Sequence, residues 1–239
     1  MVRSVPSLSP HPPLSPVPRA LVPAVTAVVF DFDGTLAETN IDFAAIRAAL
    51  RDFFAERGVW DETLFQRYIL EMIDTVCARL SREEATDLRV QAMAIVRQGE
   101  FEACRDAAPY PGVPEALRIL ERRGYRLGIF TRNARECCKH ILGRHPLPYS
   151  VLLTRDDVAN VKPHPEHLQQ VLARLDCPPD RALVVGDHYT DVETARAVGA
   201  PAIGVLTTHG ERERFMEAGA LLVIDSVADL PPFLPDHPA

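Results

Sequence analysis

The sequence predicts an α/β protein with a Rossmann-like parallel sheet flanked by helices and a small all-helical domain inserted after the first strand. Short, almost wholly apolar runs rich in valine recur along the chain and alternate with amphipathic helical segments, as buried parallel strands and their crossover helices require. One interval, residues 40–108, interrupts this alternation and carries only helical periodicity. The chain of 239 residues is long enough for an α/β domain with such an insertion.

Six runs are predicted to be strands because each is short, apolar and bounded by polar or turn-forming residues. The first, TAVVFDF, ends with Asp31 and Phe32, and a second carboxylate, Asp33, follows directly. The helices between strands are predicted from apolar residues on one face, as in VPEALRILERRG, which stops at Gly124. The runs are residues 26–32, 125–131, 150–154, 182–187, 202–206 and 221–224.

Composition divides the chain into a core, an insertion and two tails. Residues 1–23 are rich in proline and serine, so we expect a disordered tail without the uninterrupted apolar segment of a targeting signal. The α/β core is expected to comprise residues 24–39 and 109–232, and residues 233–239 a C-terminal tail. The helical insertion is expected to span residues 40–108, with three apolar stripes that each predict a helix, the second running from Leu64 to Leu80.

Charge and cysteine content exclude several classes of function. The net charge is −7 and no long basic block occurs, which argues against nucleic acid or an anionic membrane as partner. No apolar run approaches the roughly 18–20 residues that a membrane span needs. The five cysteines match no disulfide or zinc spacing, so we expect free or buried thiols and a cytoplasmic location. A small molecule is the expected partner, and the sequence carries no signal for an oligomeric state.

Polar side chains follow several of the predicted strands. In an open α/β sheet, ligands bind beyond the carboxyl ends of the strands, so residues delivered there should converge. The first strand delivers two aspartates, the second a Thr-Arg-Asn sequence, and the fourth two further aspartates, while a lysine precedes the helix between the third and fourth strands. These residues are Asp31, Asp33, Thr131, Arg132, Asn133, Lys162, Asp187 and Asp191.

The order of these motifs resembles that of a known family. Asp-x-Asp-Gly-Thr-Leu, a threonine after the second strand, a lysine before proline, and Gly-Asp-x-x-x-Asp occur in turn. Over about residues 25–230 the sequence resembles the haloacid dehalogenase superfamily of hydrolases, and most closely its phosphoglycolate-phosphatase-like branch. The resemblance implies that the insertion is a C1 cap. It also implies a Mg²⁺-dependent phosphatase that hydrolyses a small phosphorylated metabolite, with a phosphoglycolate-like substrate as one option, through an aspartyl-phosphate.

The chemistry of the residues agrees with this expectation. Asp31 can act as the nucleophile, but each unit pair of like charges about 4 Å apart costs about 4 kcal/mol at an effective dielectric of about 20. Asp31, Asp187 and the backbone carbonyl of Asp33 are hard oxygen ligands that suit Mg²⁺. The metal would bring nucleophile and phosphate together, and Lys162 would add positive charge beside Asp31.

The loop after the second strand and the second aspartate receive separate roles. In the resembling family, the residue that corresponds to Asp33 protonates the leaving oxygen and then activates the attacking water. The hydroxyl of Thr131 and the amide of Asn133 are expected to donate hydrogen bonds to phosphoryl oxygens. Arg132 is a candidate contact for phosphate or substrate.

Two residues are predicted to act around this centre. Asp191 is expected to orient Lys162 or a metal-bound water. Because a cap selects the leaving group as it closes, Arg47 in the insertion is a candidate contact for a substrate carboxylate.

Three alternative functions fit part of the pattern. A 2-haloacid dehalogenase lacks an acid two residues after its nucleophile, so Asp33 argues against it. A catalytically silent binding protein on the same fold is disfavoured by the intact set of Asp31, Asp33, Lys162 and Asp187. A phosphomutase of the same superfamily shares the motifs and stays open.

Overall fold

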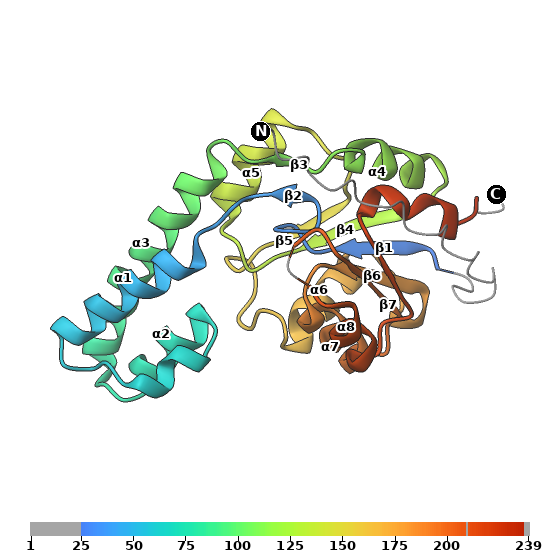
Figure 1. Cartoon of the computed structure of the whole chain (residues 1–239). Coiled ribbons are helices and arrows are strands. Elements are labelled where there is room, and N and C mark those ends of the chain that lie inside the picture. The colour runs from blue at the N-terminus through green and yellow to red at the C-terminus, as the bar shows by residue number, and fades with distance from the viewer. Residues whose placement is uncertain (1–24, 209, 237–239) are drawn as a thin grey trace, which may run out of the picture.

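The structure, a computed structural model, describes residues 25–208 and 210–236 (Figure 1). The predicted N-terminal tail, residues 1–23, lies outside the described residues, as do the last three residues of the predicted C-terminal tail. The described chain consists of a central sheet with helices on both faces and a helical insertion at one end of the sheet (Figure 1).

The central sheet has six strands, all parallel, in the order β5-β4-β1-β6-β7-β8. The first strand is therefore in the middle, paired with β4 on one side and β6 on the other. The predicted fold class is confirmed. The strand bounds are β1 (Ala27–Phe30), β4 (Arg126–Phe130), β5 (Val151–Leu153), β6 (Ala182–Gly186), β7 (Ala202–Val205) and β8 (Leu222–Ile224).

Side chains of β1 alternate between two hydrophobic clusters, one on each face of the sheet. Val28 and Phe30 pack in the cluster formed with α4, α5 and the C-terminal 3₁₀ turns. Ala27 and Val29 pack in the cluster formed with α6, α7 and α8. The bounds are α4 (Val113–Arg122), α5 (Arg135–Arg144), α6 (Pro165–Arg174), α7 (Tyr189–Val198), α8 (Arg212–Ala218), η2 (Pro179–Arg181), η3 (Val227–Asp229) and η4 (Pro231–Phe233).

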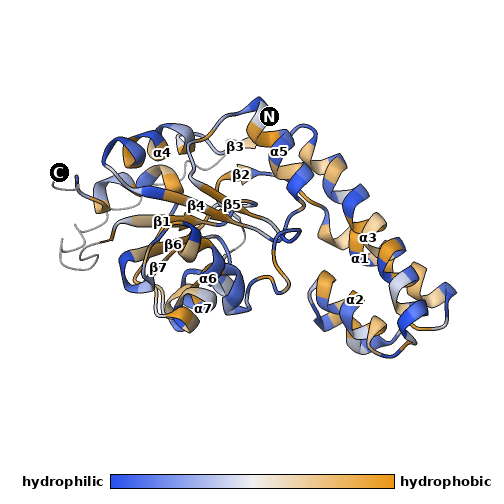
Figure 2. Cartoon of the chain, turned by 180° about the vertical axis from the view of Figure 1, so that it is seen from behind, coloured by the Kyte–Doolittle hydropathy of each residue, from blue (hydrophilic) through white to orange (hydrophobic). Residues whose placement is uncertain are grey.

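Burial on both faces explains why the strands read as continuous apolar runs (Figure 2). The helices are amphipathic, with apolar residues toward the sheet and polar residues outward (Figure 2). No helix within the described ranges is long and apolar enough to cross a membrane.

The helical insertion leaves and rejoins the core through a short antiparallel pair, β2 (Ala37–Glu38) and β3 (Ala108–Pro109). It contains α1 (Phe43–Glu56), η1 (Glu62–Gln66), α2 (Ile69–Cys77) and α3 (Arg82–Cys104), which surround their own hydrophobic cluster. The insertion extends from the end of the sheet toward which β1 points (Figure 1).

The prediction of a single second helix in the insertion is wrong. The chain is extended at Arg67 and Tyr68, so the apolar stripe from Leu64 to Leu80 is divided between η1 and α2. Leu64, Met72 and Val76 nevertheless pack in one cluster, because a short break can preserve the direction of a buried face.

Candidate active site

Asp31 lies at the carboxyl end of the central strand. Its backbone N–H donates to the carbonyl of Val185 at 2.9 Å, which fixes the residue between β1 and β6. The residue is only 7% exposed. The Nζ of Lys162 lies 2.5 Å from Asp31 Oδ1, and the backbone N–H of Phe32 donates to the same oxygen at 2.7 Å. The carboxylate is therefore held in one orientation.

Lys162 is buried and bridges two carboxylates. Its Nζ lies 2.5 Å from Asp31 Oδ1 and 2.8 Å from Asp191 Oδ1. Burial opposes the charged ammonium, but the attraction of Asp191 and Asp31 outweighs it and raises the pKa of Lys162. The predicted proximity of this lysine to the nucleophile candidate is present, and so is its predicted contact with Asp191.

His167 contacts the backbone of Lys162. Its Nδ1 accepts the backbone N–H of Lys162 at 3.4 Å, and its Nε2 lies 3.1 Å from the carbonyl of Leu153. One nitrogen must accept and the other donate, so these contacts require the neutral ring. Burial is the main cause that lowers the pKa of His167 to about 4.

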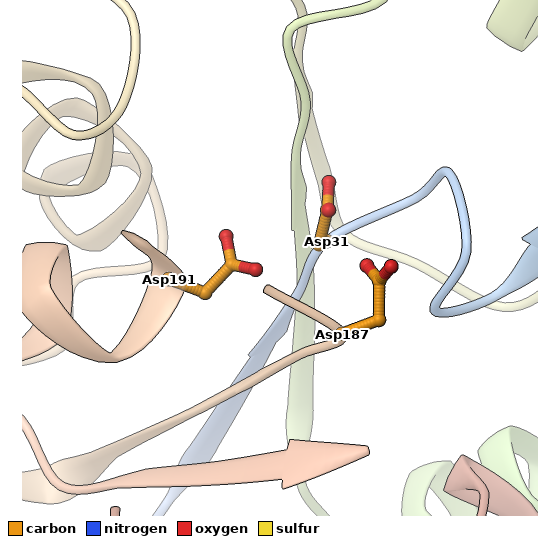
Figure 3. Close-up of side chains that lie close together, drawn as sticks. All are labelled: Asp31, Asp187 and Asp191. Carbon is orange, nitrogen blue, oxygen red and sulfur yellow. The ribbon is translucent and has the colours of Figure 1, made fainter. Parts of the chain in front are cut away.

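Three carboxylates meet beside this lysine. One oxygen each from Asp31, Asp187 and Asp191 lies within 4.8 Å of the others, and the residues come from the ends of β1 and β6 and from α7 (Figure 3). Burial first, and then the charges of neighbouring aspartates, raise the pKa of Asp31 and of Asp187. The lysine offsets only one of the three negative charges. A divalent cation would offset the other two, and hard carboxylate oxygens are what Mg²⁺ prefers.

Two threonines orient Asp187. Thr35 donates from Oγ1 to Asp187 Oδ1 at 2.9 Å and accepts the backbone N–H of Asp187 at the same distance. Thr208 donates to Asp187 Oδ2 at 2.8 Å. Gly34 has a φ of +75°, and a Cβ there would collide with the carboxylate of Asp187. The glycine after the two aspartates is thus required by backbone conformation and by close approach.

Asp191 is both a helix cap and a member of the cluster. Its Oδ2 accepts the backbone N–H of His188 at 3.2 Å, which completes a capping box at the start of α7. Its Oδ1 is the partner of Lys162. A Cβ at Gly186 would collide with this carboxylate, so the last residue of β6 must be glycine. The sequence predicted an outer role for Asp191, and the structure places it among the possible metal ligands.

The side chain of Asp33 faces different partners from those of Asp31. Thr131 donates from Oγ1 to Asp33 Oδ2 at 2.9 Å, and Asn133 donates from Nδ2 to Asp33 Oδ1 at 2.7 Å. Both donors were predicted to contact phosphoryl oxygens. In the structure they orient the second aspartate, and the two aspartates of the motif occupy separate environments.

Arg132 lies where the insertion meets the core. Its guanidinium carbon is 4.8 Å from the ring centre of Tyr68, at the start of α2. The hydroxyl of Tyr68 lies 3.2 Å from that of Tyr189 at the start of α7. The insertion therefore contacts the core directly beside the sheet edge that carries the aspartates.

Arg47 bonds within the insertion. Its Nη1 donates to the carbonyl of Arg67 at 2.7 Å and lies 3.4 Å from both the carbonyl of Phe65 and the sulfur of Met72. These contacts join α1 to the extended stretch before α2. Its predicted contact with a substrate carboxylate stays a prediction.

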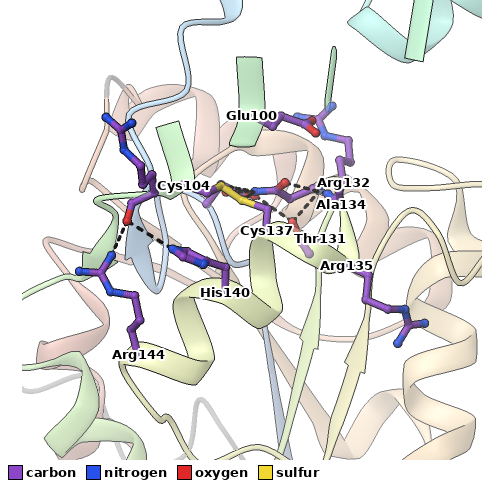
Figure 4. Close-up of a disulfide and its surroundings, with 12 residues drawn as sticks. Glu100, Cys104, Thr131, Arg132, Ala134, Arg135, Cys137, His140 and Arg144 are labelled. Atoms are coloured by element: carbon purple, nitrogen blue, oxygen red, sulfur yellow. Dashed lines mark hydrogen bonds between the residues drawn. A yellow bond between two sulfur atoms is a disulfide. The ribbon is translucent and has the colours of Figure 1, made fainter. Parts of the chain in front are cut away.

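A disulfide joins the insertion to the core. Cys104 at the end of α3 pairs with Cys137 in α5, beside Thr131 and Arg132 (Figure 4). The expectation of free thiols is wrong for this pair and correct for Cys77, Cys138 and Cys177. The sequence spacing gave no sign of the pairing because the two cysteines meet only when α3 packs against α5.

Comparison with known proteins decides the family. A family model described as haloacid dehalogenase-like hydrolase matches residues 28–205, which is most of the chain. The chain belongs to this family. The family membership inferred from the order of the motifs is therefore confirmed.

Several relatives of known name or structure match along most of their length. Pyrophosphatase PpaX of Bacillus cereus is 29% identical over 213 residues, covering 88% of this chain and 96% of that protein. A hydrolase from Pseudomonas syringae has a TM-score of 0.69 and 26% identity, covering 86% of this chain and 95% of the other. CbbY from Rhodobacter sphaeroides, solved in complex with phosphate, has a TM-score of 0.63 and 27% identity, covering 86% and 96%.

Proposed function

We propose that this protein is a Mg²⁺-dependent phosphatase that hydrolyses a small phosphorylated substrate through a phosphorylated Asp31. The observation that carries the proposal is the separation of the two aspartates. Asp31 lies in a carboxylate cluster against Lys162. Asp33, two residues later, is turned toward Thr131 and Asn133. This separation supports the proposal that Asp31 attacks and that Asp33 transfers the proton.

In the proposed reaction, an oxygen of Asp31 attacks phosphorus, and the bond from phosphorus to the leaving oxygen breaks. Asp33 supplies a proton to that oxygen. In the second step Asp33 takes a proton from the water that attacks the phosphorylated Asp31 and releases phosphate. Lys162 neutralises charge beside Asp31 throughout.

The cation would be held by the carboxylates of Asp31, Asp187 and Asp191. The backbone carbonyl of Asp33, which the sequence predicts to be a ligand, would be a further one. Bound there, Mg²⁺ would supply positive charge to the nucleophile and the phosphoryl oxygens. Thr35 and Thr208 keep both oxygens of Asp187 in fixed positions, as ligands of a metal need.

The names of relatives support phosphate chemistry and suggest substrates. The Bacillus cereus relative is a pyrophosphatase, and the Rhodobacter sphaeroides protein was solved with phosphate. We therefore propose inorganic pyrophosphate and small phosphate monoesters, including a phosphoglycolate-like compound, as the substrates to test. The phosphomutase alternative shares the first step and differs in its product.

The proposal is tested by measuring phosphate release from p-nitrophenyl phosphate, phosphoglycolate and pyrophosphate, with Mg²⁺ and after chelation. We expect turnover only with the metal. A rapid acid quench followed by peptide mass spectrometry should find the phosphoryl group on Asp31. Full activity after complete chelation would contradict the metal requirement. A sugar phosphate is incubated in parallel, and its isomerisation without phosphate release would instead support the mutase.

A further inference from the structure

A buried ion pair connects the helical insertion to the core. Glu100 lies on α3, and Arg155 follows β5. Their side chains are 6% and 5% exposed. Both terminal nitrogens of Arg155 meet both oxygens of Glu100, with Nη2 at 2.6 Å from Oε2. The arrangement is the bidentate one that a guanidinium and a carboxylate adopt when their relative position is fixed.

Arg155 also holds the loop that follows β4. Its Nη1 donates to the backbone carbonyl of Arg132 at 3.1 Å. Its own backbone N–H donates to the carbonyl of Asn133 at 3.3 Å. The Nη1 of Arg155 also contacts Glu100, so this carboxylate lies beside the backbone of Arg132 (Figure 4). One arginine therefore contacts two successive carbonyls of the loop and one carboxylate of the insertion.

The same loop carries the donors that orient Asp33. Thr131 and Asn133 each donate to one of its two oxygens. The backbone N–H of Asn133 also donates to Thr131 Oγ1 at 3.0 Å, which couples the two donors. A displacement of the carbonyls of residues 132 and 133 would move both donors relative to Asp33.

Stability alone does not account for this pair. A buried ion pair often contributes little net stability, because removing two charges from water offsets their attraction. Here burial raises the pKa of Glu100 against the effect of Arg155. The Nε of Arg155 has no hydrogen-bond partner in the part of the chain that the structure describes. An incompletely satisfied pair in this position is better explained by what it holds in place.

We propose that Glu100 and Arg155 are a positioning pair that aligns Thr131 and Asn133 with Asp33 when α3 is seated on the core. The position of the insertion then sets the geometry of proton transfer, while the nucleophile and the carboxylate cluster are unaffected. The inference rests on the proposed function, in which Asp33 carries the proton.

The decisive variants are Glu100→Gln, Arg155→Gln and the double variant. Each single variant leaves a buried charge unpaired, so we expect a lower melting temperature and a kcat reduced at least tenfold. KM for p-nitrophenyl phosphate and the affinity for Mg²⁺ should change less than threefold. The double variant removes both charges, so its melting temperature should return toward that of the native protein. Its kcat should stay low, since the shorter amide side chain at position 155 cannot reach both position 100 and the carbonyl of Arg132.

The matched control is Asp74→Asn. Asp74 pairs with Arg89 at 2.7 Å within the insertion, and both side chains are exposed. This variant breaks an ion pair of the insertion that does not reach the core, and its kcat should equal that of the native protein. Recovery of both kcat and melting temperature in the double variant would overturn the proposal, because a merely structural pair behaves in that way. An equal loss of kcat in Asp74→Asn would overturn it as well.

Amide hydrogen exchange separates this proposal from the proposed function. Peptides covering residues 131–134 should exchange faster in Glu100→Gln than in the native protein. Their exchange should be unchanged in Asp74→Asn. Neither measurement requires a known substrate. Unchanged exchange in Glu100→Gln overturns the positioning role even if the enzyme is an active phosphatase. Faster exchange in a protein that hydrolyses no phosphate compound supports the control of this loop by the pair and contradicts the proposed function.

Discussion

The side chain of Asp31 is surrounded by residues of the core, whereas that of Asp33 contacts a loop that is also attached to the insertion. Asp31 contacts Lys162 and the carboxylate cluster, all from the core. Asp33 contacts a loop that is connected to the insertion in two places. Asn133 Nδ2 lies 3.2 Å from the sulfur of Cys137, whose disulfide partner is at the end of α3. The second connection is the Glu100–Arg155 pair.

Asp31 is thus surrounded by the core alone, whereas the surroundings of Asp33 also depend on the insertion. Bond formation to phosphorus needs a nucleophile and positive charge whose positions do not depend on the insertion. Proton transfer to the leaving oxygen is useful only when a substrate is enclosed, because water would otherwise compete. If the insertion positions the donors to Asp33, proton transfer to the leaving oxygen is coupled to enclosure of the substrate by the insertion.

The largest effect is expected from Asp31→Asn, because an amide is not a nucleophile toward phosphorus. We expect kcat to fall more than about a thousandfold. The free energy of unfolding should be unchanged or higher, since one of three neighbouring buried negative charges is removed. Steady-state hydrolysis and thermal unfolding measure the two quantities. A variant that retains a tenth of native kcat would exclude a phosphorylated Asp31.

Asp33→Asn should have the next largest effect. The amide cannot carry a proton, so kcat should fall by about 10²–10⁴-fold. Mg²⁺ affinity, measured by calorimetry, should stay within about twofold of the native value, because the side chain of Asp33 is held by Thr131 and Asn133. Loss of metal affinity as the main defect would show that the two aspartates are not separated in function.

Most of the core side of the site could be predicted from the sequence. Parallel strands place their carboxyl ends at one edge, so Asp31 and Asp187 had to approach each other. Thr35 lies inside the recognised motif and could have been found there. Thr208 could not, because it follows β7 in a segment without a recognisable pattern.

The insertion side of the site could not be predicted in the same way. Glu100 and Cys104 meet their partners only through the packing of α3 against the core, which no local periodicity determines. The break at Arg67 and Tyr68 was hidden because the apolar stripe continues across it. Contacts between elements that are remote in sequence depend on docking geometry, whereas the sheet edge follows from topology.

A pH experiment on His167 tests the core side without touching a catalytic group. Its pKa is about 4 in the folded protein and 6.5 ordinarily. Stability from the neutral ring is complete above pH 6.5 and is lost as the pH falls toward 4, because the unfolded chain then binds the proton more strongly. The loss approaches about 3 kcal/mol. Urea unfolding between pH 7.5 and 4 should show this slope in the native protein and a correspondingly smaller one in His167→Gln. Parallel profiles would mean that the ring is not held neutral.

Arg47→Gln tests the contacts within the insertion and should have the smallest effect on stability and activity. Loss of the hydrogen bonds to the carbonyls of Arg67 and Phe65 should lower the free energy of unfolding by about 1 kcal/mol. Arg51→Gln is the control, since Arg51 lies on the same helix and pairs only with its exposed neighbour Asp52 among the residues that the structure describes.

The kinetics of Arg47→Gln distinguish its two possible roles. Arg47 holds the stretch that leads to Tyr68, whose ring faces Arg132. A purely structural arginine would therefore change kcat/KM about equally, and by no more than about twofold, for p-nitrophenyl phosphate and for phosphoglycolate. An arginine that binds a substrate carboxylate would raise KM for phosphoglycolate alone. Because only one substrate carries the carboxylate, the ratio of the two effects decides whether the insertion recognises the leaving group through Arg47 or only holds Tyr68 over the core.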